Sequence, residues 1–282
     1  MEMRDVYASQ YAQVNDLVSA AFQYPAQHFF FDDFPIWGSS LVTRLGVFDG
    51  PKLVSHVGIR FAEMQTGAGS EKIALIGAVA TDEKYRGQGH STALLKEALK
   101  RIDAAKYSWS FLWGSEHAFY GKLGFQLYGV QARARLSDLE VQSRNLISKS
   151  IQSGFTDEIF KALCNTKIGI RLKAEDRTWI AQQKTVKWYY LEKPFAFIAY
   201  EKGMDLKNIV HEMGGDLNGI QTLLYSIYSK NPDAEILGTQ TELKKIGLSE
   251  NNLIQEHLCL ARALDSTKRW KEEYWVSGIS AC

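Results

Sequence analysis

One segment constrains the fold of this chain more than any other, because it joins an apolar run, a turn with two glycines and a periodic stretch. The run from Ile73 to Ala80 is apolar throughout, which predicts a central strand with both faces covered. The turn contains Arg86-Gly87-Gln88-Gly89. Apolar residues then recur at helical spacing, which predicts an amphipathic helix: Leu94, Leu95, Ala98, Leu99, Ile102 and Ala105. A strand, a glycine-rich turn and a helix N-terminus together form an arrangement that binds phosphate groups through backbone N–H groups.

The spacing of this turn separates it from two other phosphate-binding loops. It lacks the Gly-Lys-Ser/Thr ending of a nucleoside triphosphate loop and the third glycine of a dinucleotide-binding loop. A tight strand-to-helix turn without any ligand is the alternative. The preceding buried strand, the helix dipole and the fixed positive charge of Arg86 favour an anion site instead.

A second motif follows downstream, Phe119-Tyr120-Gly121-Lys122-Leu123-Gly124-Phe125. Together with Arg86-x-x-Gly89-x-Ser91, it resembles the two signatures of the GNAT N-acetyltransferases, and the resemblance covers roughly residues 4–136. Ser91 stands where the family usually has Gly or Ala, and His90 stands where an apolar residue is common. The resemblance implies an α/β domain at residues 1–140 with the GNAT fold, a mixed, mostly antiparallel central sheet flanked by helices.

The resemblance also implies a binding site for acetyl-coenzyme A. Backbone groups of Val79, Ala80 and Thr81 would pair with the pantetheine arm and polarise the thioester carbonyl. The pyrophosphate would be bound by the turn and the first helical turn, that is by Arg86, Gly87, Gln88, Gly89, His90, Ser91 and Thr92. Ser115 and Glu116, a pair also found in the enhanced-intracellular-survival (Eis-like) subgroup, would line the far side.

Tyr120 is the general acid that the resemblance implies, since it would protonate the departing thiolate. A thiol with a pKa of about 8.5 and a phenol with a pKa of about 10 suit this transfer. The alternative is a packed aromatic residue in a short helix. The general base is open, because residues 73–80 contain no carboxylate. Glu116 and His117 are nearby in sequence, and in the Eis-like subgroup the terminal carboxylate, here that of Cys282, approaches the site.

The acceptor is also open. Asp32 and Asp33 lie among the aromatic residues of Phe29–Pro35 and predict a pocket that binds a cationic amine, although a buried connection between two elements is the alternative. Small amines, aminoglycoside-like molecules, peptide N-termini and lysine side chains all fit such a pocket. A second function remains, that of a non-catalytic coenzyme A-binding regulatory or interaction protein.

Further strands and helices are predicted on both sides of a polar linker at residues 137–157. In the first half we expect strands at 4–7, 45–50, 52–64, 107–113 and 125–136, and helices at 10–22 and 115–123. In the second half we expect strands at 186–191, 194–200, 205–211 and 234–238, and a helix at 219–229. This order echoes the first half without its phosphate turn, so residues 150–282 are interpreted as a degenerate GNAT-like domain. Eis-like proteins usually carry a further lipid-carrier-type domain, for which 282 residues leave little room.

Composition excludes several classes of function. A net charge of +1 gives no general attraction to nucleic acid or to an acidic membrane, and no apolar run approaches the roughly 20 residues that span a bilayer. The N-terminus lacks the apolar stretch of a signal peptide, and three distant cysteines suit a reduced, cytoplasmic protein. We expect no metal, because His211-Glu212 lacks a second histidine at zinc-protease spacing. The aromatic cluster Trp270–Trp275 predicts a packing segment or a homodimer contact.

Overall fold

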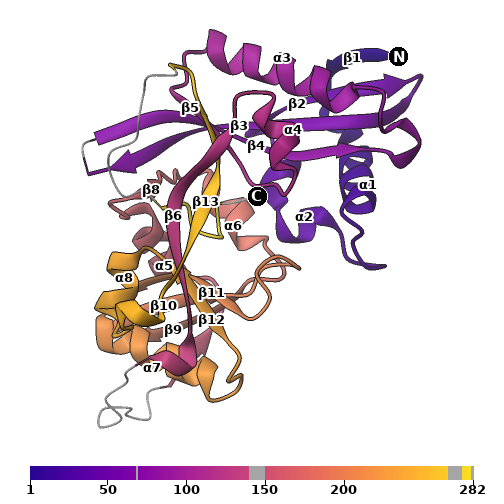
Figure 1. Ribbon diagram of the computed structural model, residues 1–282. Coiled ribbons are helices and arrows are strands. Elements are labelled where there is room, and N and C mark those ends of the chain that lie inside the picture. Colours follow the sequence, from indigo (N-terminus) through magenta and orange to yellow (C-terminus); the bar gives the residue numbers. More distant parts are fainter. Residues whose placement is uncertain (68, 140–149, 266–274, 281–282) are drawn as a thin grey trace.

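The computed structural model describes residues 1–67, 69–139, 150–265 and 275–280 of the chain. These residues form a mixed α/β structure around one continuous sheet of 13 strands (Figure 1). The order along the sheet is β1-β2-β3-β4-β5-β13-β6-β12-β11-β10-β9-β7, and β8 pairs with β3. The predicted mixed, mostly antiparallel sheet is confirmed, since only β4–β5 and β11–β12 pair in parallel.

The first half contributes six strands and four α-helices to the described structure. They are β1 (Glu2–Asp5), α1 (Tyr11–Ala21), α2 (Phe30–Asp33), β2 (Val42–Asp49), β3 (Lys52–Thr66), β4 (Gly69–Thr81), α3 (His90–Ala104), β5 (Trp109–Leu112), α4 (His117–Gly121) and β6 (Gln126–Arg135). The second half adds β7 (Gln152–Ser153), α5 (Asp157–Cys164), β8 (Gly169–Ile170), α6 (Asp176–Ala181), β9 (Lys187–Glu192), β10 (Phe195–Tyr200), β11 (Ile209–Gly215), α7 (Leu217–Tyr228), β12 (Glu235–Gly238), α8 (Gln240–Lys245) and β13 (Ile254–Ala263).

Strand β4 is buried on both faces, as its apolar run predicts. Successive side chains of a strand point to opposite faces, and here Ile73 and Leu75 join the core cluster that contains Val14 of α1. Ala74 and Ile76 join the cluster formed with α3 instead. Figure 1 shows α3 and α1 on opposite sides of these strands. The two helices therefore fix β4 in the middle of the first half.

The two halves exchange their last strands. β13, from the end of the chain, lies between β5 and β6 and is antiparallel to both. β6, from the first half, in turn pairs with β12 of the second half. Figure 1 shows β6 and β13 running side by side through the centre of the molecule. A boundary at residues 140–150 therefore divides the sequence but not the sheet.

The repeat of element order is also a repeat of geometry. In the first half α3 connects the parallel strands β4 and β5, and in the second half α7 connects the parallel strands β11 and β12. In the order β5-β13-β6-β12, the parallel pair β4–β5 lies next to β13 of the second half. The parallel pair β11–β12 lies next to β6 of the first half. This arrangement gives the second half its resemblance to the first.

Several expectations differ from the structure. The strand expected at 205–211 begins only at Ile209, because residues 203–208 form turns and Asn208 adopts a positive φ of 62°. Helices α5, α6 and α8 and strands β7, β8 and β13 were not expected from the sequence. Most of the predicted linker, at residues 140–149, lies outside the described residues.

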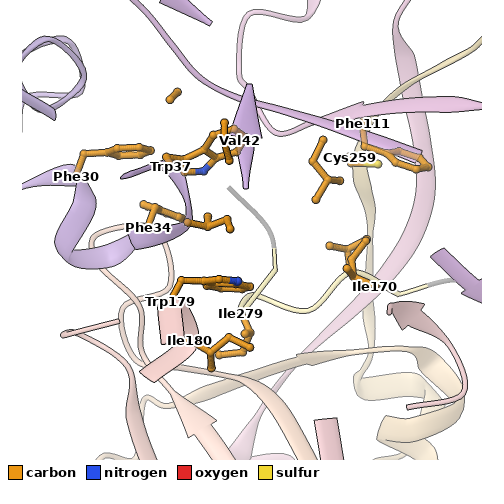
Figure 2. Close-up of a cluster of buried hydrophobic side chains, with 14 of the residues drawn as sticks. Phe30, Phe34, Trp37, Val42, Phe111, Ile170, Trp179, Ile180, Cys259 and Ile279 are labelled. Carbon is orange, nitrogen blue, oxygen red and sulfur yellow. The ribbon is translucent and has the colours of Figure 1, made fainter. Parts of the chain in front are cut away.

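Apolar clusters that contain residues of both halves join them. Figure 2 shows Phe30 and Phe34 of the first half in the same cluster as Trp179, Ile180 and Ile279 of the second. Beside it, the buried guanidinium of Arg60 lies 3.0 Å from the carboxylate of Asp176. No helix in the described parts of the chain combines the length and the apolar character needed to cross a bilayer.

Candidate active site

The site begins where β4 and β5 separate. Among the described residues the two strands pair from Ile73 to Leu75, so the edge of β4 facing β5 is open from Gly77 onward. A β-bulge lies at this point, since His56 pairs with Ala80 whereas Gly58 pairs with Gly77. Two residues of β4 therefore face one residue of β3, which bends the strand away from β5. The two strands therefore separate from this point and leave a V-shaped opening between them.

Ala78 sits in the bulge with a positive φ of 51°, which is unusual for a residue with a side chain. The fully buried His56 lies behind it, and Nδ1 of His56 donates to the carbonyl of Ala78 at 2.7 Å. Burial lowers the pKa of His56, and nearby Arg44 lowers it as well, whereas the hydrogen bond to Ala78 opposes both effects. The pKa that results is about 4. A neutral histidine thus holds the bulge in place.

The turn before α3 has the geometry of an anion site. Gly87 and Gly89 have φ values of 77° and 82°, a region that favours glycine, and a Cβ at either position would contact nothing within 4 Å. No side chain caps the N-terminus of α3, so its first N–H groups, which have no intrahelical partners, point outward. Within the described residues Nε2 of His90 is buried without a hydrogen-bond partner. Arg86 is exposed at the turn.

Ser91 is explained by a chain of hydroxyl groups. Its Oγ lies 3.2 Å from Oγ1 of Thr81, which lies 2.8 Å from Oγ of Ser55. The hydroxyl of Ser55 also donates to the carbonyl of Ala80. The hydroxyl of Ser91, which the usual Gly or Ala would lack, therefore links the end of β4 to the start of α3. The side chain of Gln88 is exposed, and Thr92 lies in the first turn of α3.

A cavity of about 630 Å³ opens at the V. This volume lies within the range of about 300–1,000 Å³ that is typical of ligand sites. Both halves line it, with Phe22, Tyr24, Phe30, Phe34, Ile76, Gly77, Ala78, Val79, Leu112, Trp113, Gly114, Ser115, Glu116, Tyr120, Gln131, Lys202, Met204, Asp205, Leu206, Leu237, Trp275, Val276 and Gly278. Val79, Ser115, Glu116 and Tyr120, all predicted from the sequence, thus meet in one space, whereas Ala80 and Thr81 lie just beyond it.

Tyr120 is held in the wall of this cavity. It is 8% exposed and packs edge-on against Phe119 and Phe125. A Cβ on Gly114 would lie 2.9 Å from Cε2 of Tyr120 and 3.4 Å from its hydroxyl oxygen. The absence of a side chain at Gly114 thus makes room for the phenol of Tyr120.

Asp32 and Asp33 do not line the cavity. Asp32 accepts from the backbone of Phe29 and pairs with Lys184 at 2.6 Å. Despite its partial burial, these contacts lower its pKa. Asp33 is fully buried and accepts hydrogen bonds from His28 at 3.0 Å and Thr185 at 2.6 Å. Both residues were expected to contact a cationic acceptor directly. Their carboxylates instead bind neighbouring residues of the protein outside the cavity lining.

The sequence gave no sign of two charged residues that do line the cavity, Lys202 and Asp205. Lys202 is buried, its Nζ donates to the carbonyl of Gly278 at 2.6 Å, and it lies 4.2 Å from the ring centroid of Phe34. Asp205 faces the cavity from the loop between β10 and β11. The sequence places Asp205 at the start of the strand expected at 205–211 and gives Lys202 no role, since only the fold brings this loop to the V.

Three other expectations concern metal and the end of the chain. The described residues contain no group of three or more potential metal ligands. His211 is buried and donates to the carbonyl of Glu201 instead, and its burial lowers its pKa to about 3. The terminal carboxylate of Cys282 and most of the Trp270–Trp275 cluster lie outside the described residues, whereas Trp275 itself is buried and lines the cavity.

Comparison with protein families matches residues 2–128 to the acetyltransferase (GNAT) domain. The first half of this chain is a GNAT acetyltransferase domain. This match supports acyl transfer as the chemistry of the site. No curated protein matches the chain.

Solved structures share the fold over both halves. A GCN5-related N-acetyltransferase from Kribbella flavida has a TM-score of 0.65 and 17% identity, over 94% of this chain and 71% of its own. One from Anabaena variabilis has a TM-score of 0.65 and 14% identity, over 94% and 73%. Eis1 from Mycobacterium abscessus has a TM-score of 0.63 and 12% identity, over 94% and 74%. The GNAT fold and the likeness to Eis-like structures are thereby confirmed.

Proposed function

We propose that this protein is an N-acetyltransferase that transfers the acetyl group of acetyl-coenzyme A to a primary amine of a small molecule or peptide. The observation that carries the proposal is that Tyr120 lines the same cavity as the open edge of β4. A proton donor thus faces the place where strand geometry allows a thioester arm to bind. The family match to residues 2–128 supports the same chemistry.

The residues of this chain fit acetyl-coenzyme A, which supplies the activated acetyl thioester when bound. The unpaired edge of β4 at Ala78 and Val79 offers backbone groups to an extended arm. Gly87, Gly89 and the uncapped start of α3 offer N–H groups to a pyrophosphate, and the unpartnered Nε2 of His90 lies beside them. Ser115 and Glu116 line the opposite side.

Tyr120 acts as the general acid in this proposal. Its hydroxyl holds the proton that the leaving sulfur takes up, and the packing against Gly114, Phe119 and Phe125 fixes its orientation. The amine attacks the acetyl carbonyl directly, and its own proton leaves toward Glu116, whose exposed carboxylate lines the rim of the cavity and connects it to solvent.

The second half serves as a degenerate GNAT-like domain that completes the cavity. Its strand–helix–strand unit matches the first half in geometry, but Asp216 caps α7 by accepting from the N–H of Gly219 at 2.9 Å. A carboxylate at this helix start repels a phosphate, whereas the corresponding start of α3 has no cap. One acetyl-coenzyme A per chain is therefore expected.

The charge balance and the cysteine content support a cytoplasmic enzyme that binds neither nucleic acid nor membranes. A homodimer stays a prediction of the sequence.

Calorimetry combined with a thiol-release assay tests the proposal against the alternative of a non-catalytic coenzyme A-binding protein. The transferase binds acetyl-coenzyme A and releases coenzyme A when amines are added. Binding of acetyl-coenzyme A without release of thiol for any amine in a broad panel would favour the regulatory or interaction protein.

A further inference from the structure

The cavity has one wall from the second half to which the proposed acetyl transfer assigns no role. The loop between β10 and β11 brings Met204, Asp205 and Leu206 to the cavity. Asp205 is accessible to solvent from the cavity but makes no hydrogen bond or ion pair with any other residue in the parts of the chain that the structure describes. Its carboxylate is therefore available to a ligand.

The surroundings of Asp205 favour a cation. Neighbouring protein atoms displace part of the water around the carboxylate and so raise its pKa. The charge of Asp33 raises the pKa further, and the charge of Lys202 opposes both effects. Lys202 does not neutralise it at bonding distance, because its Nζ is directed to the carbonyl of Gly278 and lies over the ring of Phe34. An ammonium group placed beside Asp205 would offset the cost of keeping this carboxylate ionised in the wall.

Charge is otherwise sparse in this space. Among the described residues that line it, only Glu116, Lys202 and Asp205 carry a formal charge, and both carboxylates are solvent-exposed, Glu116 on the wall from the first half and Asp205 on the wall from the second. The wall from the second half thus offers one carboxylate, that of Asp205, which suits one ammonium group. An acceptor with several ammonium groups would bring the others close to Lys202, which would repel them.

The rest of the wall is aromatic or aliphatic. Phe30 stacks on Phe34 with ring centroids 4.9 Å apart, and the edge of Tyr24 meets Phe30 at 6.2 Å. Trp113 and Trp275 line the same cavity. Such walls stabilise an apolar body and leave few partners for the hydroxyl groups of a sugar-like acceptor.

We propose that the acceptor is a monoamine on an aromatic or other apolar body, bound inside the cavity with its ammonium group paired to Asp205. The proposal rests on the transferase function above and names the acceptor class of that site. The apolar body would contact the aromatic wall, and pairing with Asp205 would hold the nitrogen in the cavity that Tyr120 also lines.

Three probe molecules separate the contributions of charge and apolar body. 2-Phenylethylamine carries both, 2-phenylethanol carries the body without the charge, and spermidine carries charges without the body. Binding is followed by tryptophan fluorescence, because Trp113 and Trp275 line the cavity and report occupancy without turnover. 2-Phenylethylamine is expected to bind at least about tenfold more tightly than either of the other two.

The variant Asp205→Asn tests the role of the carboxylate. It is expected to weaken binding of 2-phenylethylamine by about tenfold or more and to leave binding of 2-phenylethanol unchanged, because a charged hydrogen bond is lost from the first probe alone. Asp233→Asn, at an exposed position of the same half, is the matched control. Thermal unfolding and acetyl-coenzyme A binding check that each variant is folded.

Tighter binding of spermidine, no binding of 2-phenylethylamine, or an Asp205→Asn protein that binds 2-phenylethylamine as well as the original would each overturn the proposal. Binding of 2-phenylethylamine that depends on Asp205 but never leads to thiol release would support this binding site and overturn the transferase function instead. Asp205-dependent binding together with thiol release supports both.

Discussion

Replacing His56 with glutamine should change how the stability of this protein depends on pH. His56 is fully buried, and its Nδ1 carries the proton donated to the carbonyl of Ala78. The other ring nitrogen, Nε2, is buried without a hydrogen-bond partner among the described residues. Protonation of Nε2 would therefore place an uncompensated charge inside the fold.

The magnitude follows from the two pKa values of the ring. Folding lowers the pKa of His56 from 6.5 to about 4. Between these values the unfolded chain binds more protons than the folded one, so this contribution is fully present above pH 6.5 and is lost as the pH falls toward 4. A difference of about 2.5 units corresponds to about 3 kcal/mol in the free energy of unfolding.

Urea unfolding of both proteins, followed by tryptophan fluorescence from about pH 7.5 down to about pH 4.5, measures this effect. The free-energy difference between the original protein and His56→Gln should shift in favour of the variant by about 1.4 kcal/mol per pH unit below pH 6. Other titrating groups, such as His211, are common to both proteins and cancel. His257→Gln, at an exposed position, is the control. A difference that stays constant across this range would refute the reasoning.

Three further substitutions test the site and the joint between the halves. Gly89→Ala should cost about 1 kcal/mol of stability, because its φ of 82° is unfavourable for alanine, and it should raise the Kd of acetyl-coenzyme A in calorimetry. Gly114→Ala should displace the ring of Tyr120 and lower kcat by about tenfold or more in the thiol-release assay, while acetyl-coenzyme A still binds. Asp176→Asn should reduce the free energy of unfolding by about 3–5 kcal/mol in urea, because it removes the charge beside buried Arg60.

Matched variants separate these effects from general destabilisation. Gly50→Ala meets the same backbone strain at a φ of 57° in the β2–β3 turn, so it should lose stability without losing affinity for acetyl-coenzyme A. Asp157→Asn disrupts an exposed pair with Arg177 and should cost less than about 1 kcal/mol. Equal losses of affinity in the two glycine variants, or of stability in the two aspartate variants, would contradict the roles assigned above.

The parts of the fold that the sequence predicts are those determined by local pattern. The apolar run of β4 and the stripe of α3 belong to contiguous residues, and both elements form where expected. Gly87 and Gly89 were predicted for the same reason, since a turn that needs positive φ requires glycine in its own sequence. Tyr120 was predicted from a short motif that also contains Phe119 and Phe125, which pack against its ring.

Features that depend on contacts between distant residues were not predicted. β13 has a buried run of only four residues, Leu258 to Ala261, and its place between β5 and β6 depends on pairing with strands more than a hundred residues away. The positive φ of Ala78 follows from its bulge against His56. Asp33 was predicted to bind a cationic acceptor, yet contacts with His28 and Thr185 occupy it, and Asp205 rather than Asp33 lines the cavity.

Turnover by Tyr120→Phe tests the central claim most directly. Phenylalanine keeps the ring that packs against Gly114 and Phe125 and removes only the hydroxyl. The variant should bind acetyl-coenzyme A as the original protein does and lose about 10²- to 10⁴-fold in kcat for thiol release with an accepted amine. Full activity of Tyr120→Phe would contradict the assignment of this residue as the proton donor.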